Sequence, residues 1–209
     1  LRLIKKGVPQ EKIKSLGIPF DPKFNEPIDK IRLMRKLKLD PQAPTILIMG
    51  GGQGLGPIKT IVKSLEIVKR NIQEIVVTGT NKKLYKTLKR RIKKYKKKVL
   101  VFGYLHNIHE LMDISNIIIT KPGGVTTAEV LAKKIPMIIV KPIPGQEANN
   151  TDYLTKKKAA IALNKPREVY LAIQDLLDDP QKLKRISENA SAISKPNASL
   201  DIARLLLEL

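Results

Sequence analysis

Short, almost continuous runs of aliphatic residues recur along this chain, each followed by a longer stretch with helical periodicity. Runs such as Ile46–Met49 and Met137–Val140 are apolar at every position, which is typical of strands buried on both faces of a parallel sheet. Alternating strands and helices predict an α/β fold with a doubly wound parallel sheet. We expect strands at 45–49, 74–78, 99–102, 116–120, 137–140 and 159–163.

The intervening stretches predict the helices and the domain plan. We expect helices near 57–70, 82–97, 106–113, 126–134 and 148–157, then consecutive helices at 166–178, 180–193 and 197–208. Residues 1–40 differ, because Gly17-Ile-Pro-Phe-Asp-Pro22 indicates an extended segment before a basic helix near 28–38. We therefore expect an interdomain linker over 1–40 and a ligand-binding domain over 41–209. The chain begins with Leu1, so we expect it to be a fragment of a longer polypeptide.

Composition narrows the classes of function. Cysteine is absent, which excludes disulfides, thiol catalysis and thiolate metal sites. The net charge of +21 attracts polyanions such as nucleic acid, anionic lipid or phosphorylated ligands, although a lysine-rich solvated surface would have the same charge. Eleven of the seventeen residues 82–98 are basic, too many for one helix stripe. Aromatic residues make up only 4%, which disfavours a nucleic-acid-binding module.

Glycine-rich and polar loops follow the predicted strands at their carboxyl ends, where ligands bind in such folds. The first loop is Gly50-Gly-Gly-Gln-Gly-Leu-Gly56. It is not a Walker loop, because Pro57 replaces the lysine, and Leu55 breaks the dinucleotide pattern. Glycines let the backbone approach a phosphate, and the helix start favours an anion. The alternative interpretation is a tight strand-to-helix turn.

The second loop is Lys121-Pro-Gly-Gly-Val-Thr-Thr-Ala-Glu129, in which Gly123 and Gly124 clear space before a helix. Thr126 and Glu129 have the spacing of a capping box, a purely structural role. A carboxylate beside a phosphate-ready helix start is also suited to accept hydrogen bonds from two ribose hydroxyls. Both interpretations of Glu129 remain open from the residues alone.

In the third loop, Pro144-Gly-Gln-Glu-Ala-Asn-Asn150, an amide and a carboxylate lead into a helix. Gln146 and Glu147 are suited to bind neighbouring hexose hydroxyls, and an ordinary polar helix start is the alternative. His106 and His109 are the only histidines, and the sequence supplies no third ligand for a metal. We therefore expect no metal site.

In order and spacing, these three loops resemble the monogalactosyldiacylglycerol synthase and processive diacylglycerol glucosyltransferase family. The similarity is carried by Met49–Pro57, by Ile119–Glu129 and by Pro144–Asn150, and Gly17-Ile-Pro19 resembles the family's crossing between domains. The resemblance implies a GT-B fold, with this chain as the Rossmann-like C-terminal half and extra helices at its C-terminal end. It also implies inverting transfer of galactose or glucose from a UDP-sugar to diacylglycerol or a related lipid, without a metal.

The resemblance also implies roles for individual residues. The diphosphate would face the loop amides, and the ribose would bind to Glu129. The sugar would bind to Gln146 and Glu147, and the uracil ring would lie against the backbone near Tyr104. The complete implied donor site comprises Gly52, Gln53, Gly54, Gly103, Tyr104, Gly123, Gly124, Val125, Thr126, Glu129, Gln146, Glu147 and Asn150. We expect a peripheral protein at an anionic membrane surface, on the cytoplasmic face, with no specific nucleic acid.

Two departures from the family's pattern matter. The first domain, which in the family supplies the general base and binds the lipid, has no counterpart in this sequence, and neither histidine matches that base. Asn116 stands where relatives often have Asp, and Gln53 where plant-type synthases have Glu, so galactose and glucose both remain open.

Three other functions are alternatives to this one. A related transferase adds N-acetylglucosamine to the peptidoglycan lipid precursor, but a different polar sequence is expected in place of Pro144-Gly-Gln-Glu147. A nucleic-acid-binding module would leave the glycine loops unexplained. A regulatory nucleotide-binding domain would suit a chain that never joins a catalytic partner.

Overall fold

Six parallel strands form one sheet in the computed structural model of this protein, which describes residues 3–208. Every predicted strand is confirmed to within one residue at either end, because each is a buried aliphatic run. The strands are β1 (Thr45–Met49), β2 (Gln73–Val77), β3 (Lys98–Phe102), β4 (Ile117–Thr120), β5 (Met137–Val140) and β6 (Ala160–Leu163). They lie in the order β3-β2-β1-β4-β5-β6, and each neighbouring pair is parallel. The order reverses between β1 and β4, which makes this the topological switch point.

Helices connect the strands as expected. They are α1 (Lys30–Lys36), α2 (Ile58–Leu65), α3 (Lys82–Arg91), α4 (Ile108–Asp113), α5 (Gly124–Ala132), α6 (Gln146–Lys156), α7 (Val169–Asp178), α8 (Pro180–Ile193) and α9 (Ala198–Leu207). Short 3-10 turns lie at η1 (Ile4–Lys6), η2 (Gln10–Lys12), η3 (Pro22–Asn25), η4 (Ile92–Lys94) and η5 (Pro166–Glu168).

Two predicted helices are too long. The segment 57–70 is helical only to Leu65, after which Ile67 and Val68 make 3-10-type bonds and the chain turns toward β2. The segment 82–97 is α-helical to Arg91 and then continues as η4. The basic run 82–98 is therefore not one helix, and its last residue, Lys98, belongs to β3.

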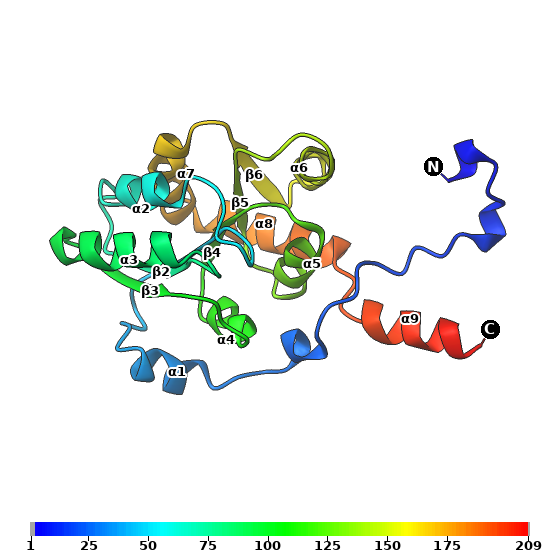
Figure 1. Ribbon diagram of the computed structural model, residues 1–209, viewed down its shortest axis with the longest axis horizontal. Coiled ribbons are helices and arrows are strands. Elements are labelled where there is room, and N and C mark those ends of the chain that lie inside the picture. Colours follow the sequence, from blue (N-terminus) through cyan, green and yellow to red (C-terminus); the bar gives the residue numbers. More distant parts are fainter. Residues whose placement is uncertain (1–2, 209) are drawn as a thin grey trace.

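The two faces of the sheet are covered by different helices (Figure 1). One face packs against α2, α3 and α7, through residues such as Val62, Leu88 and Ile173. The other packs against α4, α5 and α6, through residues such as Met112 and Leu154. Alternate residues of the buried strands point to the two faces, so a strand such as β1 is buried along its whole length.

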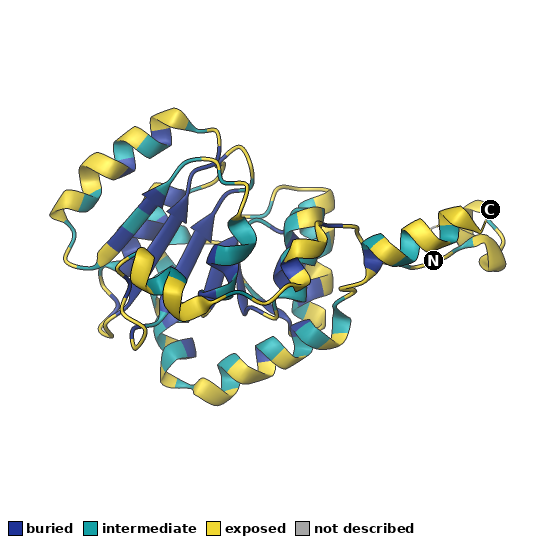
Figure 2. Ribbon diagram, turned by 90° about the horizontal axis from the view of Figure 1, so that it is seen from below, coloured by how far each residue is buried: buried dark blue, intermediate teal, exposed yellow. Residues whose placement is uncertain are grey.

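The segment before β1 is partly integrated into this second layer. Phe20, Phe24 and Leu39 are buried in the core, and Ser199 bonds both the backbone N–H and the carbonyl of Phe20. By contrast, the segment that begins at Leu3 and helix α9 extend away from the sheet on the same side of the molecule, and most of their residues are exposed (Figure 2). Within residues 3–208, no helix combines the length and apolarity needed to cross a membrane.

One carboxyl group lies inside the core. Glu74 on β2 is fully buried, and neither of its side-chain oxygens has a hydrogen-bond partner among the described residues. Burial, followed by the nearby Glu66, raises the pKa of Glu74 well above its ordinary value. Burial therefore favours the neutral form of this carboxyl group, which lies in the core and apart from the loops discussed below.

Candidate functional site

The loops singled out in the sequence meet along the carboxyl edge of the sheet. Residues 50–56 follow β1 and residues 121–124 follow β4, and these two strands are neighbours at the switch point. The loops after β2, β3 and β5 lie on the same edge, since all the strands are parallel. This edge is where an open α/β sheet binds ligands.

Several glycines of this edge are required by the chain's own backbone. A Cβ on Gly54 would lie 1.9 Å from the carbonyl oxygen of Thr78, and one on Gly79 would lie 2.1 Å from that of Gly52. A Cβ on Gly50 would lie 2.0 Å from the carbonyl oxygen of Leu55. The tight-turn interpretation of the first loop therefore accounts for Gly50 and Gly54. The loops after β1 and β2 are locked together, with Thr80 N–H donating to the Gly52 carbonyl at 2.8 Å.

Other glycines leave space that the fold does not fill. An added Cβ on Gly51 or Gly56 would meet nothing within 4 Å. On Gly52 it would meet only the ring of Tyr104, at 3.9 Å. Tyr104 and Gly103 line a cavity of about 450 Å³ together with Gly79, Thr80, Lys82 and Tyr85. Gln53 is exposed on the same loop. This part of the edge is open to a planar ligand beside Tyr104.

Helix α5 begins with an uncapped N-terminus. Gly123 is the N-cap residue, with φ −63° and ψ 146°, and its carbonyl accepts the first helical bond, from Thr127 N–H. The predicted capping box is wrong, because the helix begins at Gly124 and no side chain caps it, so Thr126 lies inside the first turn. The N–H groups of Gly124, Val125 and Thr126 precede the first helical bond and are left for a ligand or for water.

Glu129 lies one turn further along α5 and is half-buried. Burial, followed by the negative charge of Asp21, raises the pKa of its carboxyl group to about 7. With the capping box excluded, Glu129 has no assigned structural partner on its own helix. A half-buried carboxyl group whose pKa is raised in this way, beside the uncapped start of a helix, is a candidate functional group.

The third loop is tied to the second by polar contacts. Asn150 donates its side-chain amide to the Pro122 carbonyl at 2.8 Å. Gln146 lies close to Gly124, since a Cβ on that glycine would be 3.5 Å from Gln146 Nε2. Lys141 before this turn is in the left-handed region, with a φ of 49°, which is unfavourable for a residue with a Cβ, whereas Gly145 adopts its φ of 100° readily. The structure thus brings Gln146, Glu147 and Asn150 next to the start of α5.

Glu147 is already engaged in this arrangement. Its Oε1 forms an ion pair with Lys121 Nζ at 2.7 Å, and its Oε2 accepts from Ile143 N–H at 2.9 Å. Both charged side chains are mostly buried, with 16% and 17% of their surfaces exposed. The carboxylate therefore holds its own loop and the second loop together, in addition to any contact with a ligand.

Two residues near the site were missed by sequence reasoning. Lys121 lies inside the Lys-Pro-Gly-Gly motif but was not assigned a role, although a lysine directly before a phosphate-ready helix was a usable signal. Asp21 lies in the Pro-rich segment 17–22 and acts on the pKa of Glu129 from 108 positions away. Nothing local in the sequence predicts that second contact.

The remaining candidates lie elsewhere. The ring of His106 packs against Tyr104 at 5.1 Å, whereas that of His109 packs against Phe24 at 5.7 Å, so the two do not share a site. The side chain of Asn116 accepts from Thr45 N–H at 2.8 Å, at the opposite, amino edge of the sheet. Within residues 3–208 no cluster of three or more potential metal ligands occurs.

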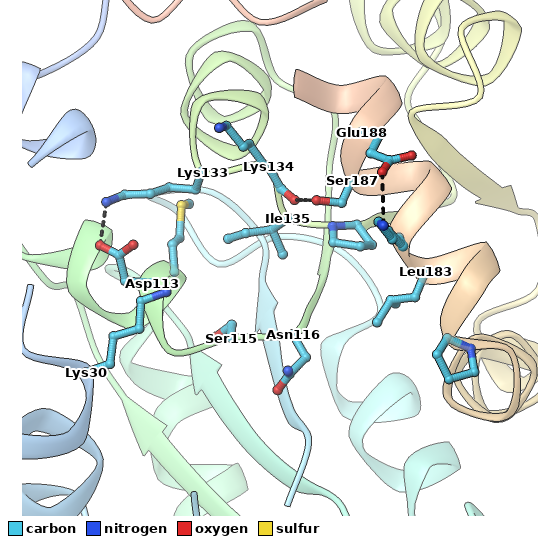
Figure 3. Close-up of a pocket in the computed structure, with 14 residues that line it drawn as sticks. Lys30, Asp113, Ser115, Asn116, Lys133, Lys134, Ile135, Leu183, Ser187 and Glu188 are labelled. Atoms are coloured by element: carbon cyan, nitrogen blue, oxygen red, sulfur yellow. Dashed lines mark hydrogen bonds and ion pairs between the residues drawn. The ribbon is translucent and has the colours of Figure 1, made fainter. Parts of the chain in front are cut away.

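The amino edge also carries two cavities, of about 470 and 640 Å³. In the first, Lys133 pairs with Asp113, Lys184 pairs with Glu188, and Ser187 donates to the Lys134 carbonyl (Figure 3). These six lining residues thus bond one another in pairs. None of the residues predicted for the site lies here.

Comparison with known proteins agrees with this geometry. Residues 45–204 match the glycosyltransferase family 28 C-terminal domain. The processive diacylglycerol beta-glucosyltransferase of Staphylococcus carnosus (strain TM300) is 36% identical over 205 residues, which are 97% of this chain and 52% of that protein. The chain spans about half the length of the curated relatives that it matches.

Solved structures of glycosyltransferases share the fold. Anabaena Alr3699/HepE in complex with UDP-glucose aligns over 99% of this chain and 60% of its own, with a TM-score of 0.68 and 19% identity. Acinetobacter baumannii MurG aligns over 89% of this chain and 55% of its own, with a TM-score of 0.69 and 18% identity. At these identities the likeness establishes the fold alone, and the predicted Rossmann-like GT-B half is confirmed.

Proposed function

Because this chain belongs to the family of the glycosyltransferase family 28 C-terminal domain, we propose that it is the donor-binding half of a UDP-hexose-dependent glycosyltransferase. The resemblance stated from its three loops is confirmed at the level of the family. The observation that carries the proposal is the meeting of those loops at the switch point, around the uncapped start of α5.

The diphosphate of the donor binds at the start of α5. The free N–H groups of Gly124, Val125 and Thr126 and the positive end of the helix dipole favour a doubly charged anion. The amides of Gly52 and Gln53 face the same anion from the first loop, whereas the N–H of Gly54 donates to the Gly51 carbonyl at 3.0 Å and holds the shape of that loop. Asn150 contributes indirectly, by holding the Pro122 carbonyl and thus the path of the chain into Gly123.

The nucleoside and the sugar lie on either side of the diphosphate. Glu129, as a carboxylate, accepts hydrogen bonds from the ribose hydroxyls. The uracil ring enters the cavity of Gly103 and Tyr104, where the tyrosine ring offers a stacking surface. Gln146 and Glu147 face the hexose, and Lys121 fixes the orientation of the Glu147 carboxylate.

The chemical contribution of this half is stabilisation of the leaving UDP. Preorganised amides and a helix N-terminus compensate the charge that develops on the diphosphate as the glycosidic bond breaks. We propose that these groups suffice without a metal, so that chelation leaves donor affinity unchanged. The general base and the acceptor site lie in another part of the enzyme.

The names of the relatives support a proposal for the acceptor, and the net charge supports one for the location. The relatives are named as diacylglycerol glucosyltransferases, so we propose diacylglycerol or a related lipid as acceptor and glucose as the first donor sugar to test. The net charge of +21 supports attraction to an anionic membrane on its cytoplasmic face, with no specific nucleic acid as a partner.

Calorimetric titration of this chain with UDP, with ADP as control, tests the proposal. We expect saturable binding of UDP and no binding of ADP, unchanged by EDTA. UDP-glucose, UDP-galactose and UDP-N-acetylglucosamine then identify the sugar. Equal affinity for UDP and ADP would contradict the proposed uracil cavity, and absence of both would remove the donor site from this chain.

A further inference from the structure

Helices α2, α3 and α7 form the layer on one face of the sheet (Figure 1). A further cavity, lined mainly by basic residues, lies on this layer. Its volume is about 530 Å³. Two lysines of α2, Lys59 and Lys63, lie four residues apart along one side of the helix, and Ile67 follows four residues later. Arg91 at the end of α3 and Arg167 in η5 complete the charged lining, with Thr60 and Ser64 between them.

The position of this cavity separates it from the donor site. Helix α2 buries Ile58, Ile61, Val62 and Leu65 against the sheet, so the side with Lys59 and Lys63 faces outward. All four basic side chains are exposed. They come from three elements that the fold brings together, and none belongs to the loops at the carboxyl edge that the proposed function uses.

The charges of this cavity are uncompensated. Four of its seven lining residues are cations and none is acidic. Within residues 3–208, none of these four forms an ion pair, whereas neighbours on the same layer do, as Arg70 does with Asp178 and Lys165 with Glu168. Like charges four residues apart weaken a helix. A bound anion would remove that cost, and no residue from 3 to 208 supplies one in an ion pair.

The chemistry of the lining selects a phosphate. The planar guanidinium groups of Arg91 and Arg167 suit bidentate bonds to phosphate oxygens, and the two lysines add point charges. Ile67 is 61% exposed at the same cavity, an apolar side chain beside four cations. Cations next to an exposed apolar group fit a phosphate that carries hydrocarbon. They do not fit nucleic acid, since no aromatic ring lines the cavity for base stacking.

We propose that the cavity formed by Lys59, Lys63, Arg91 and Arg167 binds the phosphate of an anionic lipid, with Ile67 entering the membrane interface. This surface would hold the α2–α3 layer against the membrane. It deepens the proposed attraction to anionic membranes by assigning that attraction to one place, and it is independent of the donor site.

Vesicle sedimentation tests the assignment. The chain is mixed with vesicles of phosphatidylcholine, with and without phosphatidylglycerol, at an ionic strength of about 0.1 M, where the Debye length is about 10 Å. The test variant is Arg91→Gln with Arg167→Gln, and the matched control is Arg32→Gln with Arg35→Gln. The control removes two exposed arginines from α1, which packs on the other face of the sheet.

We expect the test variant to bind phosphatidylglycerol vesicles about 30-fold more weakly than the natural chain, from the usual contribution of a basic residue at such a surface. The control should change by less than about 3-fold, because charges beyond a Debye length are screened. Both variants should bind UDP as the natural chain does, which shows that they fold and separates this test from that of the donor site. Equal losses in both variants would overturn the proposal, because a diffuse field would then account for binding.

A second arm separates the lipid from a free phosphate compound. Ile67→Ser should weaken vesicle binding without changing competition by soluble glycerol phosphate. If glycerol phosphate displaces the chain from vesicles at equal phosphate concentration, and Ile67→Ser has no effect, the ligand is a soluble phosphate and the lipid assignment is wrong.

Discussion

The two edges of the sheet carry polar cavities and clefts of similar size but opposite character. At the amino edge, Lys133, Lys184 and Ser187 find their partners within the chain, so these three groups of the cavity lining are satisfied (Figure 3). At the carboxyl edge, the start of α5 and Glu129 converge without such partners. The comparison teaches that the volume of a cavity does not mark a ligand site in this fold. Polar groups without a partner in the fold are the better mark of a ligand site, because burying them unpaired is costly unless a ligand satisfies them.

The largest effect is expected where the carboxyl edge uses glycine for its own backbone. Gly54→Ala should lower the free energy of unfolding by at least about 3 kcal/mol, since its Cβ would overlap the Thr78 carbonyl. Gly51→Ala, the matched control, has a similarly positive φ but open space and should cost about 1 kcal/mol. Urea unfolding measures both. Equal losses would show that strain, and not the close approach of the two loops, makes glycine necessary.

The next prediction concerns the amino edge. Lys133→Met leaves the mostly buried Asp113 unpaired and should destabilise the fold by about 3 kcal/mol, while UDP affinity stays the same. Lys184→Met breaks the exposed pair with Glu188 and should cost less than about 0.5 kcal/mol. Thermal unfolding and UDP titration check both. A loss of UDP affinity in Lys133→Met would break the distinction between the two edges.

At the carboxyl edge, Glu129→Gln should weaken UDP binding about 10- to 100-fold, the usual value of a hydrogen bond to a charged group. Inorganic pyrophosphate should bind as before, because it has no ribose. Asp21→Asn, as the matched control, removes the charge that raises the pKa of Glu129 and should leave UDP binding at least as strong. A similar loss for UDP and pyrophosphate would rule out the ribose role.

Lys121→Met should affect the sugar more than the nucleotide. Without Lys121 the carboxylate of Glu147 is released from one of its two contacts, so the third loop loses its fixed position. We expect UDP-glucose to lose about 5-fold more affinity than UDP, with partial recovery in Lys121→Arg. Calorimetry with both ligands gives the ratio, and an unchanged ratio would limit Lys121 to a structural role.

The last prediction concerns the pH dependence of Glu129, with an effect of the same order as that of Lys121→Met. Its raised pKa of about 7 means that the carboxylate needed for ribose is lost as the pH falls through 7. Lowering the pH from 7.5 to 6 should weaken UDP binding roughly 8-fold, and the Glu129→Gln variant should show only the titration of UDP itself.

The contribution of Glu129 to the free energy of unfolding depends on pH in the opposite direction. A carboxyl group whose pKa is raised on folding favours the folded state at low pH, and that contribution is lost as the pH rises through about 7. Parallel profiles for both proteins would exclude Glu129 as the titrating group.

Much of the fold was predictable because its signals are local. Buried aliphatic runs predict all six strands, and the glycine-rich or polar loops that follow them predict the carboxyl edge. Helix ends were less predictable. The end of α2 at Leu65 depends on how the chain reaches β2, and the start of α5 at Gly124 depends on the backbone of Gly123, which replaced the predicted cap at Thr126.

The sequence by itself determined the sheet, the family and the loops at the carboxyl edge, because each depends on a pattern within a few consecutive residues. The tertiary structure decided which groups in those loops are free. It assigned Gly54 and Gly79 to contacts within the chain, paired Glu147 with Lys121, and brought Asp21 close enough to raise the pKa of Glu129. It also gathered Arg91 and Arg167 beside α2. These relations join residues from different elements, so their distances and charges exist only once the chain has folded.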